Sequence, residues 1–332
     1  MTADFKFIDI VTPQFLKDTY IAGVDLTLDD GTPYSETMFE HSIAAALRMI
    51  ENELGIVVDD TPITAERHDA NSDNKRAWWP ISVDHRPLKS VEDIAITYGN
   101  YEPTSIPLSW VNIDSENAGQ IHLIPSAETL GTFSFSNAIP LLVDPITNYS
   151  YYRYVPSYFR LKYNAGFNYI KRTITIPQGQ TSITVDLGET LVDRPNFIFD
   201  VTQTGLLDAT AKHTVRGYGG YRSNEVEIRL NTAPDAGDCI IELKVHTVPE
   251  VLIRCVGLLA AILPLDIAGD LIVGAGIARF QVSVDDLRQE VDTTSSATNS
   301  GYGARILSYK NTLKAYVKAL KADYQHIKFG VI

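Results

Sequence analysis

A block of short apolar strands, residues 171–247, is followed directly by a stretch of the chain whose patterning is helical. Residues 173–176 and 182–185 flank a Pro-Gln-Gly-Gln turn, which is typical of a β-hairpin. Four more strands are predicted at regular spacing, over 197–199, 212–215, 226–230 and 240–245. Six short strands separated by turn residues predict a small, Ig-like β-sandwich. Because helical patterning resumes directly after it, we interpret the block as an insertion.

Helical patterning precedes the block. A helix is predicted from about Pro33 to Leu54, with Thr32 as its N-cap and Gly55 as the residue that ends it. Its apolar residues recur every three or four positions and so share one face: Phe39, Ile43, Ala46, Leu47, Ile50 and Leu54. A shorter helix is predicted over about 13–20. Both helices need a partner surface to cover their apolar sides.

Helical patterning also follows the block directly. Thr247 and Glu250 form a capping box that predicts a helix from Glu250, which Pro264 would end. This helix is apolar on nearly every side apart from Arg254, as expected of a helix buried in a core or between subunits. Charged residues and Pro264 interrupt the apolar run 251–277 before about 20 clean residues accumulate, so no membrane span is expected.

The last predicted helix, about 304–325, carries two stripes. One stripe is apolar and contains Ile306, Tyr309, Leu313, Val317, Leu320 and Tyr324. The other stripe is basic and contains Lys310, Lys314, Lys318 and Lys321. The apolar stripe needs a packing partner within the protein. The basic stripe is a candidate interface for an acidic partner, and Arg254 of the preceding helix is a further candidate interface residue.

Charge is segregated along the chain. Twenty-eight Lys and Arg against 41 Asp and Glu give a formal net charge of −13. From residue 301 onward six basic residues and one acid give +5, which leaves −18 for the remainder. An acidic chain of this kind is not expected to wrap nucleic acid, because phosphate binding needs clustered positive charge.

Residues 56–167 read as strands joined by long loops, with strands expected near 94–98, 110–113, 120–124 and 159–163. The following candidate interface tyrosines lie beside Arg153 and Arg160: Tyr151, Tyr152, Tyr154 and Tyr158. Tyrosines among cations suit either single-stranded nucleic acid or a protein interface, and the acidic balance favours an interface or a sheet surface. The sequence therefore predicts an α+β protein in which a discontinuous domain, 1–170 and 248–332, carries the inserted sandwich 171–247.

No catalytic, cofactor or metal site is expected. The seven histidines lack metal-ligand spacing, and Cys239 and Cys255 lack a zinc or redox spacing. The run from Asp69 to Asp73 resembles the opening of a calcium loop, but Asn74 and Pro80 stand where such a loop needs Gly and Glu. The N-terminus does not read as a signal peptide, so we expect synthesis in a cytoplasm.

Three segments in this order resemble a known family. They are SETMFEHSIAAALRMIENELG (35–55), YNAGF (163–167) and VPEVLIRCVGLLAAI (248–262), and the segments 268–278 and 283–306 strengthen the likeness. The chain resembles the head-to-tail adaptor, or connector, proteins of tailed bacteriophages over roughly three quarters of its length. In that family an A-G-[YF] strand end usually runs directly into an I-P-x-x-[LI] helix. Residues 168–247 separate the two here.

The resemblance implies a structural virion protein without enzymatic activity or cofactor. Such proteins form a ring of about twelve subunits that docks under the portal protein at the neck of the virion. The ring extends the channel for double-stranded DNA and offers a platform to tail and neck proteins. The inserted sandwich departs from the family pattern, and we expect it to face outward.

Two other functions remain open at this stage. One is a tail or neck decoration protein whose β-sandwich binds a carbohydrate or receptor. The other is an enzyme of the lytic apparatus, for which the sequence shows no convergent catalytic residues.

Overall fold

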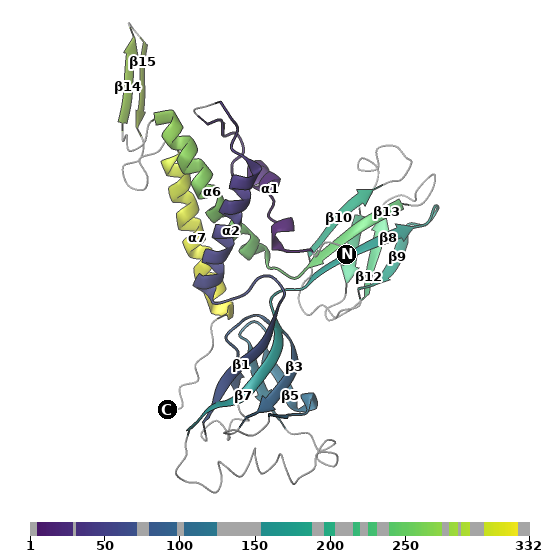
Figure 1. Ribbon diagram of the computed structural model, residues 1–332. Coiled ribbons are helices and arrows are strands. Elements are labelled where there is room, and N and C mark those ends of the chain that lie inside the picture. Colours follow the sequence, from purple (N-terminus) through teal and green to yellow (C-terminus); the bar gives the residue numbers. More distant parts are fainter. Residues whose placement is uncertain are drawn as a thin grey trace. The chain divides into compact units, whose positions relative to one another are not determined.

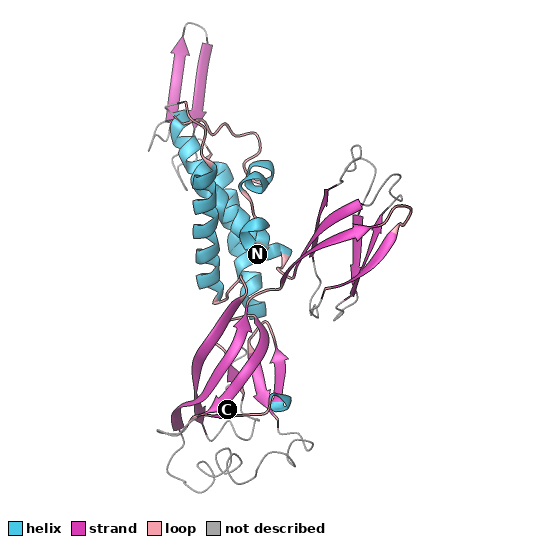
Figure 2. Cartoon of the chain, turned by 45° about the vertical axis from the view of Figure 1, so that its right-hand side comes forward, coloured by secondary structure: helices cyan, strands magenta, loops and turns pink. Residues whose placement is uncertain are grey.

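The described α-helices lie in one compact unit of the chain, which also holds one short hairpin, and the other described antiparallel sheets lie in a second unit. The computed structural model divides into a helical unit, Phe7–Ile56 with Pro249–Ile332, and a β unit, Met1–Lys6 with Val57–Val248. Every described strand pairing is antiparallel, so the protein belongs to the α+β class (Figure 2). The structure describes residues 5–28, 31–71, 80–97, 103–124, 154–187, 196–202, 215–219, 225–230, 239–273, 279–284, 287–292 and 302–324.

Three long helices make the body of the helical unit (Figure 1). The 3₁₀ turn η1 and the α-helices have these bounds: η1 Phe7–Asp9, α1 Pro13–Thr19, α2 Glu36–Leu54, α6 Glu250–Val273 and α7 Gly303–Tyr324. α6 contacts both α2 and α7, and α2 also contacts α7. The expected face of α2 is buried, and so are Ile306, Leu320 and Tyr324 of α7. The helices of the bundle therefore cover one another's apolar sides.

The start of α2 differs from the prediction. The helix begins at Glu36, and the hydroxyl of Ser35 caps it by accepting the amide N–H of Met38. Thr32 does not cap the helix, because it lies in a turn before the helix begins. There its carbonyl oxygen accepts the Leu28 N–H, and Pro33 forms an isolated bridge with Thr27. The end of α2 is as predicted, since Gly55 has φ +67°, a left-handed conformation that favours glycine.

α6 is longer than predicted and lacks the predicted cap. It runs through Pro264 to Val273, so the prediction that Pro264 ends it is wrong. Proline removes one helical hydrogen bond, and the burial of nearby residues such as Ala261, Leu265 and Ala268 offsets that cost. The Thr247 hydroxyl accepts the Asn168 N–H at 3.0 Å, so it is used in the β unit.

A short β-hairpin lies between α6 and α7 in the sequence. Its strands are β14 Arg279–Val284 and β15 Leu287–Asp292, which pair with each other over six residue pairs. In the described part of the chain these two strands form a sheet of their own.

Two small sheets make the first part of the β unit. The four-stranded sheet has the order β1-β7-β3-β4, and the three-stranded sheet has the order β2-β6-β5. The strand bounds are β1 Thr61–Asn71, β2 Ile81–Ser82, β3 Leu88–Ile96, β4 Thr104–Ser105, β5 Val111–Ser115, β6 Gln120–Leu123 and β7 Tyr154–Ala165. The 3₁₀ turn η3, Leu108–Trp110, leads into β5.

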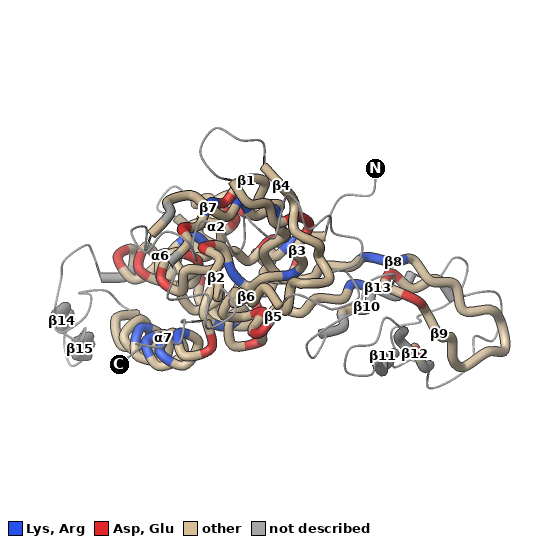
Figure 3. The backbone as a smooth tube through the Cα atoms, turned by 90° about the horizontal axis from the view of Figure 1, so that it is seen from below, with Lys and Arg blue, Asp and Glu red and all other residues tan. Residues whose placement is uncertain are grey.

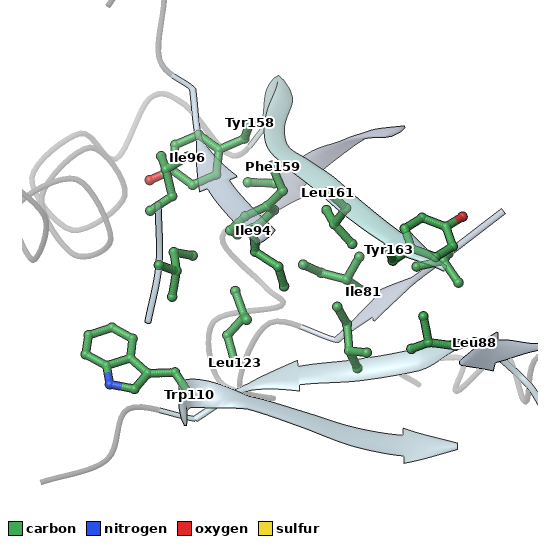
Figure 4. Packing of buried hydrophobic residues seen from close by; sticks show 14 of the residues in the cluster. Ile81, Leu88, Ile94, Ile96, Trp110, Leu123, Tyr158, Phe159, Leu161 and Tyr163 are labelled. Carbon is green, nitrogen blue, oxygen red and sulfur yellow. The ribbon is translucent and has the colours of Figure 1, made fainter. Parts of the chain in front are cut away.

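One hydrophobic core joins these two sheets (Figure 4). It gathers Trp110 from η3, Leu123 from β6, and residues of β3 and β7 such as Ile94 and Leu161. Tyr158 and Phe159 meet edge to face within it, with ring centroids 4.9 Å apart. The alternation predicted for 159–163 is thus the buried face of β7.

The second part of the β unit is the strand block identified in the sequence. Its strands are β8 Tyr169–Ile176, β9 Ser182–Asp186, β10 Asn196–Thr202, β11 Val215–Gly219, β12 Glu225–Leu230 and β13 Cys239–His246. They form two three-stranded sheets, β10-β13-β8 and β11-β12-β9. A cluster that includes Ile174, Ile183, Ile228 and Ile241 draws on both sheets. The predicted hairpin of 173–176 with 182–185 is wrong, because β8 pairs with β13 and β9 pairs with β12.

The two ends of the strand block are hydrogen-bonded to each other. Thr247 donates its N–H to the Asn168 carbonyl oxygen at 3.2 Å, and the Asn168 N–H returns to the Thr247 hydroxyl. The compact units divide the chain at a different place from the predicted domains, since 57–170 belongs with the strand block and not with the helices.

Candidate partner interface and buried polar cluster

The lysines of the basic stripe recur along α7, where Figure 3 marks them in blue. Lys310, Lys314 and Lys318 are exposed, whereas Lys321 is half-buried and forms an ion pair with Glu53 of α2. Lys321 therefore takes part in packing within the helical unit. Three of the four predicted lysines remain as a candidate interface.

Arg254 does not join the lysine stripe. Its Nε lies 3.2 Å from Glu250 Oε1, one turn earlier on α6. Hydrogen bonding to Glu250, and then to Tyr316, raises the pKa of Arg254. Tyr316 lies on the opposite flank of α7 from the lysines, because five residues separate it from Lys321.

The four candidate tyrosines do not form one surface. Tyr151 and Tyr152 lie outside the described residues. Tyr154 is 57% exposed and donates its hydroxyl to the Asp69 carboxylate. Tyr158 is fully buried, so the prediction that it forms part of an interface is wrong. Its ring belongs to the core between the two sheets. Strand alternation with Phe159 and Leu161 inward would have placed Tyr158 on the opposite side, so its burial next to Phe159 has no local signal in the sequence.

A buried carboxylate in the β unit binds several donors that sequence reasoning missed. Glu66 of β1 is 8% exposed, and its Oε1 lies 2.5 Å from His68 Nε2 and 2.9 Å from the amide nitrogen of Asp84. Its Oε2 lies 3.1 Å from His85 Nδ1 and accepts the hydroxyl of Tyr163. The cluster thus ties β1, β7 and the segment between β2 and β3 together.

Electrostatics keep the Glu66 carboxyl ionised. Burial raises its pKa, but hydrogen bonds from His68, Tyr163, the Asp84 N–H and His85 outweigh burial and lower the pKa to about 2. The same cluster raises the pKa of Tyr163, through burial first and then its bond to Glu66. A buried anion satisfied by four donors holds strands in register. We assign Glu66 this structural role.

The sequence contains a weak signal for this cluster. Glu66 and His68 are two residues apart in a strand, so they share one face of β1. His85 and Tyr163 are 19 and 97 residues from Glu66 in the sequence, and only the tertiary fold brings them together. Long-range pairing of this kind leaves no local pattern.

Candidate metal ligands do not come together in the described part of the chain. Within the described ranges no group of three His, Cys, Asp or Glu is arranged to hold a metal ion. The Asp69 carboxylate of the calcium-like run is taken by Tyr154 and by the Ser157 N–H at 2.7 Å. Asp73 lies outside the described residues. Burial raises the pKa of the Cys255 thiol to about 12, so this cysteine is a poor nucleophile.

α6 is long and apolar enough to cross a membrane by length and composition. Its segment Glu250–Leu271 has a mean hydropathy of 2.2, and 61% of the most apolar window is buried inside the protein. The central helix of a bundle meets the same test, and α6 packs against two other helices.

No protein-family model matches the chain, and no curated protein matches it.

Proposed function

We propose that the protein is a head-to-tail adaptor of a tailed bacteriophage, a structural protein whose ring of about twelve subunits docks on the portal protein. In this proposal it resides in the neck of the virion, extends the channel for double-stranded DNA and carries tail or neck proteins. The order of the family-like segments supports the assignment. The strand block, inserted where the family pattern is usually continuous, would face outward.

One observation supports the docking step: α7 exposes a row of lysines, whereas the rest of the chain has a negative net charge. Lys310, Lys314 and Lys318 are exposed on one helix, whereas residues before 301 sum to −18. Like charge between the acidic remainder and DNA removes the counterion-release gain that makes proteins adhere to phosphate. A basic helix face is then the natural contact for an acidic portal surface.

Charge reversal tests this docking step. We expect Lys310→Glu, Lys314→Glu and Lys318→Glu, combined in the full chain, to abolish co-sedimentation with purified portal rings. Lys321 stays unchanged, because its ion pair with Glu53 belongs to the bundle. The matched control places Glu at Ser308, Ala315 and Ala319, which are exposed elsewhere on α7, and should dock normally. Undiminished docking of the lysine variant would overturn the proposal for this face.

Ring formation is tested by imaging. Negative-stain micrographs of the protein mixed with portal rings should show an added ring on the axis of the portal. A mixture in which the portal rings remain bare at saturating protein contradicts the adaptor assignment.

A second candidate is a decoration protein whose strand block binds carbohydrate. The observation that favours it is that the block has its own hydrophobic cluster, separate from the core around Trp110. Binding of the full chain to a glycan array, lost when the block is removed, would favour this candidate. The adaptor proposal expects no glycan binding.

A further inference from the structure

Two arginines lie directly opposite each other on the outer face of the four-stranded sheet. Arg67 of β1 is the cross-strand partner of Arg160 of β7, and the two strands run side by side (Figure 1). Phe159 and Leu161, the neighbours of Arg160 in β7, point into the core (Figure 4), so both arginines lie on the other side of the sheet. Like charges directly opposite each other destabilise a sheet. An anion is therefore expected close to this pair.

No residue in the described part of the chain supplies that anion. Within these residues neither Arg67 nor Arg160 forms an ion pair or a side-chain hydrogen bond, and Nε of Arg160 is buried without a partner. Arg67 is exposed and Arg160 is half-buried. The pair is thus accessible and electrostatically unsatisfied.

A lysine pair in the same chain shows how such a pair can be satisfied internally. Lys171 of β8 and Lys244 of β13 are also direct cross-strand partners. Oε1 of Glu242, which precedes Lys244 by two residues in β13, lies 3.0 Å from Lys171 Nζ and 3.4 Å from Lys244 Nζ. One carboxylate therefore bridges the two opposed cations.

The corresponding carboxylate near the arginine pair is already used. Asp69 follows Arg67 by two residues in β1, the same separation as between Glu242 and Lys244. Its carboxylate accepts the hydroxyl of Tyr154 and, at 2.7 Å, the N–H of Ser157. The arginine pair thus lacks the internal carboxylate that the lysine pair has.

The buried cluster on the core side of β1 holds this pair in place. Arg67 lies between Glu66 and His68, whose side chains are hydrogen-bonded to each other. The pairing of β1 with β7 is unbroken from Glu66 to His68. Groups that are held in position before binding lose less conformational freedom when a ligand arrives.

The surroundings of the pair favour a single carboxylate over a polyanion. Guanidinium groups bind carboxylate and phosphate in the same bidentate geometry. A nucleic-acid backbone would bring further phosphates close to Asp69 and to Asp93, which lies on β3 opposite Lys162. The net charge of −13 also opposes the approach of a polyanion. A protein can present one carboxylate without further negative charge.

We propose that Arg67 and Arg160 bind a carboxylate of a partner protein, in the role that Glu242 has between Lys171 and Lys244. The site lies outside α7 and outside the segments that resemble the adaptor family, so it does not rest on the proposed function. If the protein is an adaptor, a neck or tail protein would provide the carboxylate.

A short blocked peptide with one glutamate between serines is the probe. The Nε–H resonances of the arginine side chains are followed by heteronuclear NMR as the peptide is added to the full-length protein. We expect the Arg160 resonance to shift saturably, because its Nε has no partner in the free protein. The same peptide with glutamine in place of glutamate should leave it unchanged. Arg254 is the internal control, since its Nε already lies 3.2 Å from Glu250 Oε1.

Two variants separate binding from structural support. Arg67→Gln should weaken peptide binding roughly tenfold, because one of the two guanidinium groups is lost. It should be at least as stable as the wild type in urea unfolding, since it removes a like charge at an exposed position. Glu242→Gln is the matched control: it removes the bridging carboxylate of the lysine pair and should lower stability in chloride, with partial recovery when acetate replaces chloride.

Four results would overturn the proposal. An Arg160 resonance that the glutamate peptide leaves unchanged would show that the pair binds no carboxylate of a protein, and acetate binding without peptide binding would assign it to a small carboxylate. Loss of stability in Arg67→Gln would make the pair structural. Inorganic phosphate acting at a concentration about a hundredfold below that of the peptide would assign it to a phosphate ligand. Because the portal does not enter these measurements, their failure leaves the adaptor proposal untouched, and peptide binding beside bare portal rings would refute the adaptor proposal alone.

Discussion

Tyr163 of β7 donates its hydroxyl to the buried carboxylate of Glu66 on β1, across 97 residues of sequence. Neither side chain reaches solvent freely, since Tyr163 is 1% exposed and Glu66 is 8% exposed. The bond joins neighbouring strands of the four-stranded sheet at the end away from Tyr154. The Tyr163 hydroxyl is one of four hydrogen-bond donors that together keep the Glu66 carboxylate ionised.

Tyr163→Phe should destabilise the β unit by about 1.5–3 kcal/mol, because it removes one donor from a buried charge. Urea unfolding followed by near-UV circular dichroism measures the change. Tyr154→Phe is the matched control: it also deletes a hydroxyl bonded to a carboxylate, but in an exposed pair, and should cost much less stability than Tyr163→Phe. Equal costs for the two variants would contradict the role assigned to Glu66.

His246 should make the protein sensitive to mild acid. Burial lowers its pKa from 6.5 to about 4, and its Nδ1 has no hydrogen-bond partner among the described residues. The unfolded chain binds this proton below pH 6.5 while the folded chain does not, so stability is full above pH 6.5 and falls as the pH drops toward 4. At pH 5 the loss from this residue is about 2 kcal/mol.

Replacing the imidazole by a ring without a titrating group isolates this effect. His246→Phe should show a smaller fall in unfolding free energy between pH 7.5 and pH 5 than the wild type, measured by urea titration at each pH. His41→Gln removes an exposed histidine of α2 and should retain the wild-type pH dependence. A His246→Phe variant as acid-sensitive as the wild type would contradict the assigned cause.

Gly257 allows α6 to approach Tyr20. A Cβ atom at this position would lie 2.3 Å from the Tyr20 ring, which is held by edge-to-face contacts with Phe15 and Tyr309. Gly257→Ala should therefore destabilise the helical unit by about 1–2 kcal/mol, although alanine favours a helix more than glycine does. Thermal unfolding measures the loss. In the double variant with Tyr20→Leu the two costs should be less than additive, and simple additivity would rule out the contact as the cause.

Local signals in the sequence predicted the elements better than their partners. The apolar periodicity of 39–54 found the face of α2 and Gly55 found its end, because both depend on neighbouring residues. The cap was misplaced because Thr32 and Pro33 belong to a turn that pairs with residues 27 and 28, which no helix rule considers. Pro264 was read as a helix end because burial of α6 by α2 and α7 cannot be seen in the local sequence.

The sheet pairing and the geometry of the candidate sites could not be predicted either, because they depend on contacts between residues far apart in the sequence. The turn at 177–180 was read as a hairpin, but β8 and β9 belong to different sheets, and their residues pair with partners 39–77 positions away in the sequence. The lysine stripe followed from helical spacing alone, whereas the loss of Lys321 to Glu53 required the packing of α7 on α2. Tyr158 was misassigned because alternation along β7 places it on the opposite side from Phe159 and Leu161, whereas the fold buries both Tyr158 and Phe159.

The hydrogen-bonded ends of the strand block predict that it can be removed. Ile170 and Val245 are paired across β8 and β13, so a two-residue Asn-Gly turn can join them in place of residues 171–244. Changing both to Thr avoids exposing apolar side chains that the block now buries. Tyr169 and His246, which pack against Phe5, are retained.

We expect the shortened chain to be monodisperse and to keep amide-exchange protection in α6 and β7. If the block faces outward as proposed, it should also dock on the portal with undiminished affinity while losing one neck or tail partner. Loss of protection in β7 would show that the block is required for folding of the rest of its unit, and loss of portal docking by a folded variant would contradict the outward placement.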